Sequence, residues 1–344
     1  MTLHERTSAF AELGNILLDA LSDHPRTAHA KSLAALIPAQ QAHNRWFTPA
    51  SVRMALEETG KMVARDKMEK WTSSYNLPAT DREPSAVALV MAGNVPLVGF
   101  HDLMTVLVSG NRALVKPSSK DPELVRRLSE ILTYINPSFS EYISFTEGHL
   151  ADFDAVIATG SDNSSRYFEY YFGSKPHIFR KNRTSLAIID NTTTSSEISA
   201  LGRDIFSYFG LGCRNVSKIF IPRGFELSDL TRGWKTYSHL GDHPSWKNNY
   251  NHNRAICLVN GEKFIDGDFF LLKEDENLIS PLTVVHYQQY ESPGEIENLI
   301  SPYKEKIQCI TGKGHLPFGT AQQPDLWDYA DNIDTMKFLL SLKK

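Results

Sequence analysis

The sequence predicts an α/β protein built on parallel β-sheets. Residues 86–92 and 155–158 are apolar throughout, have the length of strands, and alternate with segments of helical spacing. Strands that are apolar on both faces are typical of a parallel sheet covered by helices on both sides. With 344 residues, the chain is long enough for two domains or one large α/β unit.

The expected elements follow in chain order. Residues 1 to about 75 are predicted to be helical, because Phe10, Leu13 and Leu17 recur at helical spacing. The prolines between residues 77 and 84 predict a linker. The strands expected beyond it are 86–92, 112–116, 142–145, 155–158, 186–189 and 216–221, and the helices are 98–108, 122–134 and 164–172.

Composition excludes several classes of protein. The net charge of −4 gives no indication of a nucleic-acid partner. The sequence contains no run of about 18 apolar residues, so we expect no membrane-spanning helix. The first twenty residues argue against a signal peptide, because they carry Glu5, Arg6, Glu12 and Asp19. The three cysteines are too widely spaced for a disulfide framework or a CxxC motif, so we expect a protein of the reducing cytoplasm.

Cys213 is the most informative residue. It follows Gly210 and Gly212, and a strand-like run begins at Val216. Glycines let the backbone come close to a ligand, so such a cysteine can offer both its sulfur and its own N–H to one substrate atom. That pairing suits a nucleophile whose amide stabilises the oxyanion it creates. The alternative is a buried structural cysteine, which is our expectation for Cys257 and Cys309 in their apolar, strand-like runs.

Three further features fall at the carboxyl ends of predicted strands, where a parallel sheet binds ligands. Asn94 can donate its amide to an oxyanion, and Lys116 can reach a ribose hydroxyl or a phosphate. Ser161, after Gly160, can cap a helix whose free N–H groups bind a diphosphate. Taken singly, these residues are equally well explained as a turn asparagine, a solvated lysine and an ordinary helix cap. No GxGxxG fingerprint is present.

The order of these features resembles the aldehyde dehydrogenase superfamily, and most closely its acyl-CoA reductase branch of the LuxC type. The matching stretches are 91–96 (oxyanion asparagine), 113–118 (ribose-binding Lys-Pro motif), 159–161 (diphosphate-binding helix start) and 210–213 (nucleophile loop). The ending, residues 324–331 and 334–336, resembles the reductase branch in particular. The resemblance covers roughly residues 85 to 340.

The resemblance implies an aldehyde dehydrogenase-like fold of two three-layer α/β domains with parallel-rich sheets. The expected domains are a Rossmann-like dinucleotide-binding domain (1–190, helical over 1–80), a catalytic cysteine domain (191–325) and a C-terminal segment (326–344). That segment is expected to pack on another subunit or back on the domain. We also expect a homo-oligomer.

The resemblance further implies NADPH-dependent reduction of an acyl-CoA, or of an acyl-carrier thioester, to an aldehyde through an acyl-cysteine intermediate. The catalytic residues implied are Cys213 and Asn94, and those implied for the cofactor are Lys116, Ser118, Ser119, Gly160 and Ser161. NADPH is expected over NADH, because Ser119, followed by Lys120, stands where NAD-preferring relatives tend to carry a glutamate.

Two departures from the family pattern bear on the chemistry. Arg180 stands where aldehyde dehydrogenases carry a glutamate base, and arginine accepts no proton at neutral pH. This argues against hydrolysis of an acyl-cysteine and fits an acyl group that arrives on a thiol and leaves as an aldehyde. Ser165 replaces the second glycine of the diphosphate helix. Arg180 and Arg214 are candidates to lower the pKa of Cys213.

Other functions stay open at the level of sequence. His239, Asp242 and His243 superficially suggest metal ligands, but Gly241 and Pro244 spoil a helical pair, so we expect no metal site. A cysteine-dependent acyltransferase or thioesterase is one alternative. A non-catalytic aldehyde dehydrogenase-like scaffold is another, and nucleotide binding would separate it from the enzyme.

Overall fold

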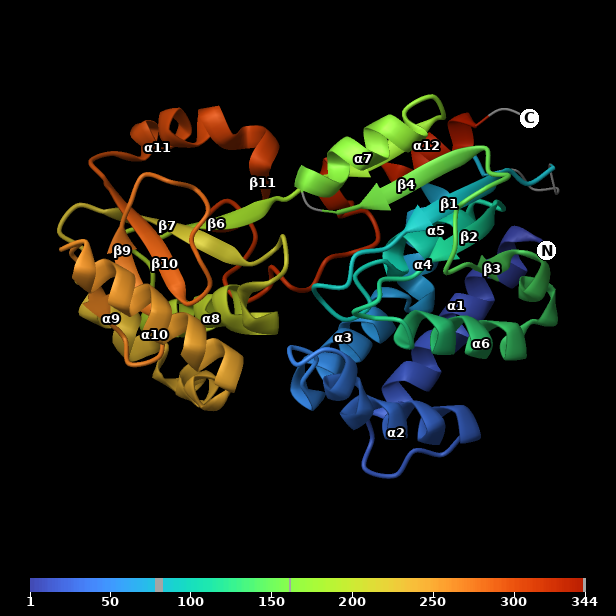
Figure 1. The fold of residues 1–344 in the computed structure, drawn as a ribbon, viewed down its shortest axis with the longest axis horizontal. Coiled ribbons are helices and arrows are strands. Elements are labelled where there is room, and N and C mark those ends of the chain that lie inside the picture. Colours follow the sequence, from blue (N-terminus) through green and yellow to red (C-terminus); the bar gives the residue numbers. More distant parts are fainter. Residues whose placement is uncertain (78–82, 161, 343–344) are drawn as a thin grey trace. The chain divides into compact units, whose positions relative to one another are not determined.

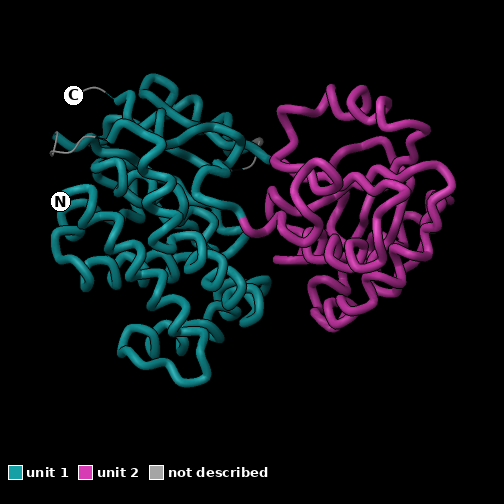
Figure 2. The backbone as a smooth tube through the Cα atoms, turned by 180° about the vertical axis from the view of Figure 1, so that it is seen from behind, with its two compact units in different colours: residues 1–182, 324–344 teal, residues 183–323 magenta. Residues whose placement is uncertain are grey.

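The computed structural model describes residues 1–77, 83–160 and 162–342 (Figure 1). Most of the linker expected between residues 77 and 84 therefore lies outside the described residues. The chain forms two compact units, coloured separately in Figure 2. Unit 1 holds residues 1–182 and 324–344, and unit 2 holds residues 183–323. Each unit is described by itself.

The N-terminal quarter of unit 1 is helical, as predicted. Its helices are α1 (Leu3–Ala20), α2 (Ala28–His43), α3 (Pro49–Met62) and α4 (Arg65–Ser73). A capping box starts α1, since the Thr2 side chain accepts from the Glu5 amide and the Glu5 side chain accepts from the Thr2 amide. Phe10 and Leu13 from the predicted apolar stripe of α1 are fully buried. This stripe joins the main core of unit 1.

The sheet of unit 1 has five parallel strands in the order β3-β2-β1-β4-β5. The strands are β1 (Ala86–Val90), β2 (Arg112–Lys116), β3 (Ile143–Phe145), β4 (Ala155–Thr159) and β5 (His177–Arg180). The helices that follow them are α5 (Phe100–Val108), α6 (Leu124–Ile135) and α7 (Asp162–Phe172), with a 3₁₀ turn at Pro137–Glu141. The predicted elements of this region are confirmed with ends that differ by a few residues.

Side chains of β1 alternate between two cores. Leu89 lies in the core that α5 and α6 share with α1, whereas Ala88 lies in a second core with Phe168 and Phe172 of α7. Helices therefore cover both faces of the sheet, as Figure 1 shows. This is the three-layer arrangement that the continuous apolar strands predict.

Unit 2 has six strands in the order β11-β6-β7-β10-β9-β8, all parallel except the β8–β9 pair. The strands are β6 (Thr184–Ile188), β7 (Val216–Pro222), β8 (Ile265–Asp266), β9 (Leu271–Glu274), β10 (Val284–Tyr290) and β11 (Ile307–Gly312). The helices are α8 (Ser195–Phe206), α9 (Ser228–Gly233), α10 (Pro244–Val259) and α11 (Pro293–Ile300), with 3₁₀ segments Ser207–Gly210, Lys235–Asp242 and Ser301–Lys306.

Both faces of the second sheet are also covered (Figure 1). Ile296 and Ile300 of α11 pack with Leu186 and Phe220 on one face. On the side of α8 and α10, Phe206 contacts Trp234, Trp246, Phe269 and Phe270 in an aromatic cluster. Cys257 lies on α10, so the strand expected around it is wrong, although the thiol is buried as predicted.

The C-terminal segment returns to unit 1 and ends in α12 (Thr335–Ser341), after a 3₁₀ turn at Ala330–Asn332. The Tyr329 hydroxyl accepts from Trp71 Nε1 at 2.8 Å and lies 2.8 Å from the Tyr75 hydroxyl. Lys67 Nζ lies 2.5 Å from Asp325 Oδ1. The ending that resembles the reductase branch thus packs against the N-terminal helices. Within the described residues, no helix has the length and apolar character needed to cross a bilayer.

Candidate active site

The loop that carries Cys213 has an unusual backbone. Three successive residues, Tyr208, Phe209 and Gly210, have left-handed φ values of 51°, 56° and 69°. Only glycine adopts this conformation without cost, so the two aromatic residues are strained. Strain of this kind persists only where surrounding contacts fix the backbone. We call residues 207–215 the nucleophile loop.

Asn215 supplies these contacts. Its Oδ1 accepts from the Gly212 amide at 2.8 Å, and its Nδ2 lies 2.8–3.2 Å from the carbonyl oxygens of Asp204, Ile205 and Ser207. The side chain is 3% exposed, so these hydrogen bonds form away from water. One buried amide therefore links the start of the nucleophile loop to its end.

Strand β6 holds the loop from the other side. Ser185 N donates to Asn215 O at 3.0 Å, and Thr184 Oγ1 donates to the same oxygen at 3.2 Å. Ser185 Oγ donates to the carbonyl oxygen of Cys213 at 3.1 Å. Cys213 itself is half-buried just before β7.

A third support comes from residues 319–321. The fully buried Asp204 carboxylate accepts from Gly319 N at 2.7 Å and from Ala321 N at 2.9 Å. Burial raises the pKa of Asp204 to about 6, although these two amides act to lower it. Arg214 Nε donates to the Ala321 carbonyl oxygen. The Arg214 side chain is thus used to join the nucleophile loop to this segment.

Arg180 lies in unit 1, at the end of β5, in a buried ion pair. Its Nη1 is 2.6 Å from Asp102 Oδ2, and its Nη2 donates to Thr335 Oγ1 at 2.8 Å. Both partners of the ion pair are almost fully buried. The positive charge of Arg180 is therefore balanced by Asp102, and its side chain joins β5 to α5 and α12.

Four of the residues predicted for oxyanion or cofactor binding share one edge of the first sheet. Asn94 follows β1, Lys116 ends β2, Ser118 follows β2, and Gly160 follows β4, which are neighbouring parallel strands. Ser119 is exposed next to Ser118. Ser161 lies outside the described residues. The carboxyl ends of these strands are the usual ligand site of a parallel sheet.

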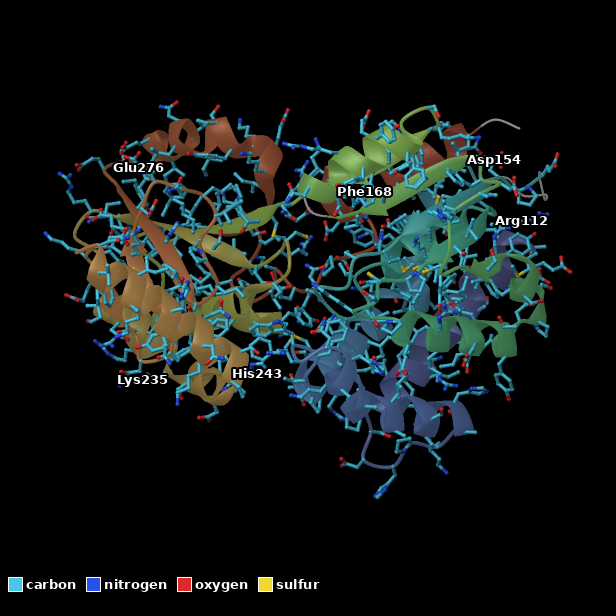
Figure 3. The ribbon with its side chains drawn as sticks, viewed as in Figure 1. Arg112, Asp154, Phe168, Lys235, His243 and Glu276 are labelled. Atoms are coloured by element: carbon cyan, nitrogen blue, oxygen red, sulfur yellow. The ribbon has the colours of Figure 1, made fainter. Side chains whose placement is uncertain are left out.

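Two glycines on this edge allow close approach. A Cβ on Gly93 would lie 2.5 Å from Ser118 Oγ, so the Asn94 turn contacts the loop after β2 directly. A Cβ on Gly160 would lie 2.8 Å from the Ser164 Cβ and 2.9 Å from a ring carbon of Phe168, the α7 residue labelled in Figure 3. Glycine alone lets α7 start this close to β4. Lys116 Nζ donates to Gly148 O at 2.9 Å.

The structure adds two residues that sequence reasoning missed. Asp121 Oδ2 accepts at 2.9 Å from the amide of Leu97, whose φ is 61°. Asn44 Nδ2 donates to Gly93 O at 3.2 Å. Both side chains are buried and brace the turn that presents the exposed Asn94. Burial raises the pKa of Asp121 to about 6 against the opposing effect of its amide donors.

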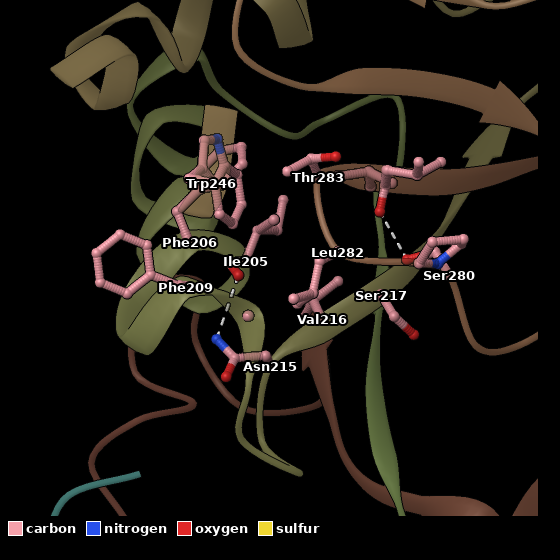
Figure 4. A pocket seen from close by; sticks show the side chains of 14 residues that line it. Ile205, Phe206, Phe209, Asn215, Val216, Ser217, Trp246, Ser280, Leu282 and Thr283 are labelled. Carbon is pink, nitrogen blue, oxygen red and sulfur yellow. Dashed lines mark hydrogen bonds between the residues drawn. The ribbon is translucent and has the colours of Figure 1, made fainter. Parts of the chain in front are cut away.

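A small pocket opens beside the nucleophile loop within unit 2 (Figure 4). Its lining includes Phe209, Gly210, Trp246 and Leu282. A cavity of about 40 Å³ has room for two or three water molecules.

The histidines considered as metal ligands have local partners. His243 Nδ1 accepts from Trp246 N at 3.4 Å at the start of α10, and its ring lies 4.6 Å from that of Phe209. His239 Nδ1 lies 3.1 Å from Thr236 O. Across the described part of the chain, no three histidine, cysteine, aspartate or glutamate side chains form a metal-binding group.

Comparison with known proteins gives the site its context. A curated relative, the 4,4'-diaponeurosporen-aldehyde dehydrogenase of Staphylococcus aureus, is 29% identical over 259 residues, which are 65% of this chain and 55% of that protein. The long-chain acyl-protein thioester reductase 2 of Photobacterium leiognathi is 26% identical over 192 residues, 50% of this chain and 40% of that protein. The chain thus spans about half the length of the curated relatives it matches.

The fold has close counterparts among solved structures. The E. coli NADP dependent enzyme superposes with a TM-score of 0.65 at 13% identity, covering 87% of this chain and 71% of that one. The predicted aldehyde dehydrogenase-like fold, with its parallel-rich sheets, is confirmed by such matches to aldehyde dehydrogenases. The sequence model of the family described as Acyl-CoA reductase (LuxC) matches residues 26–228, more than half of the chain. The chain therefore belongs to the acyl-CoA reductase family of the LuxC type.

Proposed function

We propose that this protein reduces an acyl thioester to an aldehyde through an acyl-cysteine on Cys213. The observation that carries the proposal is the held conformation of the nucleophile loop. A strained backbone, fixed by Asn215 and Ser185, presents a half-buried thiol at the head of a parallel strand. Membership of the acyl-CoA reductase family, and relatives named acyl-protein thioester reductases, support the same chemistry.

The first half of the proposed reaction is acyl transfer. Cys213 Sγ attacks the thioester carbonyl, the carbon–sulfur bond of the substrate breaks, and the thiol of CoA or of an acyl-carrier protein leaves. Asn94 and the Cys213 N–H stabilise the oxyanion, and one such donor contributes about 3 kcal/mol to the transition state. The product is a thioester on Cys213.

The second half is reduction. A nicotinamide cofactor supplies a hydride when bound. The residues proposed to hold it are Lys116, Ser118, Ser119, Gly160 and Ser161. The observation that fits this role is the close approach of α7 to β4 at Gly160, where a Cβ would meet Ser164 and Phe168 of α7. Cys213 then leaves as a thiolate, and the aldehyde is released.

Arg180 explains why the acyl group would not be hydrolysed. A water molecule needs a base to attack an acyl-cysteine efficiently. The residue in the position of the family's base is a guanidinium paired with Asp102, which cannot accept a proton. The acyl-cysteine then persists until it is reduced.

We further propose NADPH as the preferred cofactor over NADH. Ser119 and Lys120 are exposed after β2, and neither repels a 2′-phosphate as a glutamate would. The solved E. coli neighbour is described as NADP dependent, but at 13% identity that likeness concerns the fold. We also propose a homo-oligomer in the cytoplasm, where the Cys213 thiol stays reduced.

The assay for this function follows reduced cofactor and products together. With an acyl-CoA series and acyl-carrier thioesters, we expect one aldehyde per NADPH consumed. Cys213→Ala should abolish turnover, and Asn94→Ala should lower kcat by about a hundredfold or more. Free acid formed without NADPH would indicate a thioesterase, and acyl transfer to an added thiol would indicate an acyltransferase. Failure to bind any nucleotide would favour the scaffold.

A further inference from the structure

Two of the three cysteines share one hydrogen-bonding partner. Ser185 Oγ lies 3.1 Å from the carbonyl oxygen of Cys213 and 3.1 Å from Sγ of Cys309. The Cys309 amide also donates to Ser185 Oγ at 3.2 Å. Ser185 is fully buried, whereas Cys213 and Cys309 are half-buried, and all three residues lie in unit 2.

The positions of the hydrogens follow from the chemistry of a hydroxyl. Ser185 has one hydrogen to donate, and it goes to the carbonyl oxygen of Cys213. The Cys309 N–H and S–H must then both donate to the lone pairs of Ser185 Oγ. Cys309 is thus held beside the nucleophile loop through Ser185.

Ser185 on β6 links the two cysteines. The two contacts of Ser185 Oγ place Cys309 Sγ no more than about 6.2 Å from the Cys213 carbonyl oxygen. Both cysteines are half-buried rather than buried, so a small oxidant can reach them.

Both strand pairings around this cluster, β11–β6 and β6–β7, are irregular. The β11–β6 pairing shifts register between Ile307 and Ile310, which flank Cys309, and the β6–β7 pairing shifts between Ser185 and Leu186. Such irregularities leave residues outside the regular ladder of hydrogen bonds. A disulfide between Cys213 and Cys309 requires these segments to hold the two Cα atoms about 4.4–6.8 Å apart.

We propose that Cys309 is a resolving thiol, which joins Cys213 in a reversible disulfide when the protein meets a peroxide. The Cys213 thiolate attacks one peroxide oxygen, the O–O bond breaks, and a sulfenic acid and one water form once a proton is taken up. Cys309 Sγ then attacks the sulfenic sulfur. The S–S bond forms, the S–O bond breaks, and the hydroxide leaves as a second water with the Cys309 proton. Two thiols are oxidised and one peroxide is reduced.

The consequence is protection of the nucleophile. A sulfenic acid with no nearby thiol proceeds to sulfinic acid, which is not reversed by ordinary thiols. A disulfide is returned to two thiols by a dithiol reductant. Oxidation to the disulfide would therefore inactivate Cys213 reversibly. This inference requires only a reactive Cys213 and holds whatever acyl group the protein accepts.

Cys257 provides a matched control. It is 5% exposed on α10, and its pKa is raised, first by burial and then by a hydrogen bond with Glu262. A thiol of this kind is a poor nucleophile. Its side chain belongs to a core cluster with Leu271 and Val284, apart from the contacts of Ser185.

The experiment is peptide mapping of the full chain after brief treatment with hydrogen peroxide. Trypsin places the three cysteines on separate peptides, 204–214, 255–263 and 307–313. In wild type, we expect peptides 204–214 and 307–313 to be linked and to separate after dithiothreitol. Under denaturing conditions, the number of titratable thiols should fall from three to one. Cys257→Ser should give the same link.

Cys309→Ser keeps the hydroxyl donor near Ser185 but removes the resolving sulfur. We expect this variant to accumulate sulfinic acid on peptide 204–214, with no recovery of the Cys213 thiol by dithiothreitol. The proposal is overturned if wild type gives sulfinic acid on Cys213 while Cys309 stays a thiol. It is equally overturned if the link joins Cys257 or two different chains. The wild-type map decides the matter even if Cys309→Ser folds poorly.

Discussion

At the scale of single residues, the nucleophile loop depends on one buried amide. Asn215 uses both ends of its side chain, since Oδ1 binds the amide of Gly212 and Nδ2 binds three carbonyl oxygens. These bonds compensate for the strain at Tyr208 and Phe209. The backbone conformation of the loop that carries Cys213 thus depends on the side chain of Asn215, two positions further along the chain.

Substituting Asn215 tests this dependence. Asn215→Asp keeps an acceptor for Gly212 but places a carboxylate against three carbonyl oxygens. We expect the free energy of unfolding to fall by about 1–3 kcal/mol for each buried group left unpaired, which lowers the Tm by several degrees. Acylation of Cys213 should slow as well. Asn248→Asp, at an exposed site on α10, is the control and should change neither property. An unchanged acylation rate in Asn215→Asp would show that the loop holds its shape without this amide.

The pKa of Asp121 predicts a pH dependence of stability. Because burial raises it from 3.8 to about 6 in the folded protein, the folded state favours the neutral carboxyl. The stability gained from that neutral form is full below about pH 4 and is lost as the pH rises to about 6. Asp121→Asn is neutral at every pH, so its Tm relative to wild type should rise across this window and then level off.

The measurement is thermal unfolding of both proteins between pH 4 and 7. Asp23→Asn, at an exposed position, serves as the control and should show no change of Tm difference across the window. A constant difference between Asp121→Asn and wild type would mean that Asp121 is ionised throughout this range.

Cofactor preference is also decided at the residue scale. We expect wild type to favour NADPH over NADH by about tenfold or more, since one charge contact contributes on the order of 1.5 kcal/mol. Ser119→Glu should move the preference toward NADH by repelling the 2′-phosphate. The ratio of kcat/KM for the two cofactors measures the shift. If wild type uses both equally and the substitution has no effect, Ser119 does not face the ribose.

At the scale of elements, Arg180 joins three of them. Its ion pair with Asp102 and its bond to Thr335 connect β5, α5 and α12. The arginine proposed to stand in the position of the family's base thus also holds a stretch of the C-terminal segment. This structural role is invisible in the sequence, because the partners are 78 and 155 positions away.

Removing one partner of this ion pair should destabilise the fold much more than removing both partners. Arg180→Met leaves the Asp102 charge buried and unpaired, which typically costs about 3–5 kcal/mol. Adding Asp102→Leu removes that charge, so the double variant should recover most of the lost Tm. The exposed pair of Lys61 and Glu57 is the control. Lys61→Met, alone or with Glu57→Leu, should change the free energy of unfolding by at most about 1 kcal/mol. A double variant no more stable than Arg180→Met would contradict this account of the pair.

Elements with local signals could be predicted from the sequence, and those fixed by distant contacts could not. The apolar run of β1 and the helical spacing of α1 suffice to predict both elements. Strand β5 has only four residues, and its polar ends, His177 and Arg180, hide it. The short apolar run around Cys257 favours a strand, yet α10 continues through it.

The candidate site shows the same division. The positions of Asn94, Lys116 and Gly160 on one edge follow from their place at the carboxyl ends of parallel strands. The side chains that brace the Asn94 turn, Asn44 and Asp121, come from the end of α2 and from a later loop, and the sequence holds no local sign of either contact.

At the scale of the whole molecule, the chain passes between its two units twice, near residues 182 and 323. Cys213 lies in unit 2, and Asn94 with the proposed cofactor residues lies in unit 1. The proposed reaction therefore needs both units at one substrate. Because the chain spans about half the length of its curated relatives, activity of this polypeptide by itself is a central point to test.

The most direct test is to trap the proposed intermediate. Intact-mass spectrometry after addition of an acyl-CoA, with no reduced cofactor present, should show one acyl group bound to wild type and none to Cys213→Ala. Later addition of NADPH should remove the acyl group as aldehyde. The adduct should persist in buffer because Arg180 provides no base for hydrolysis. An adduct that survives Cys213→Ala, or one that is rapidly lost as free acid, would contradict the account.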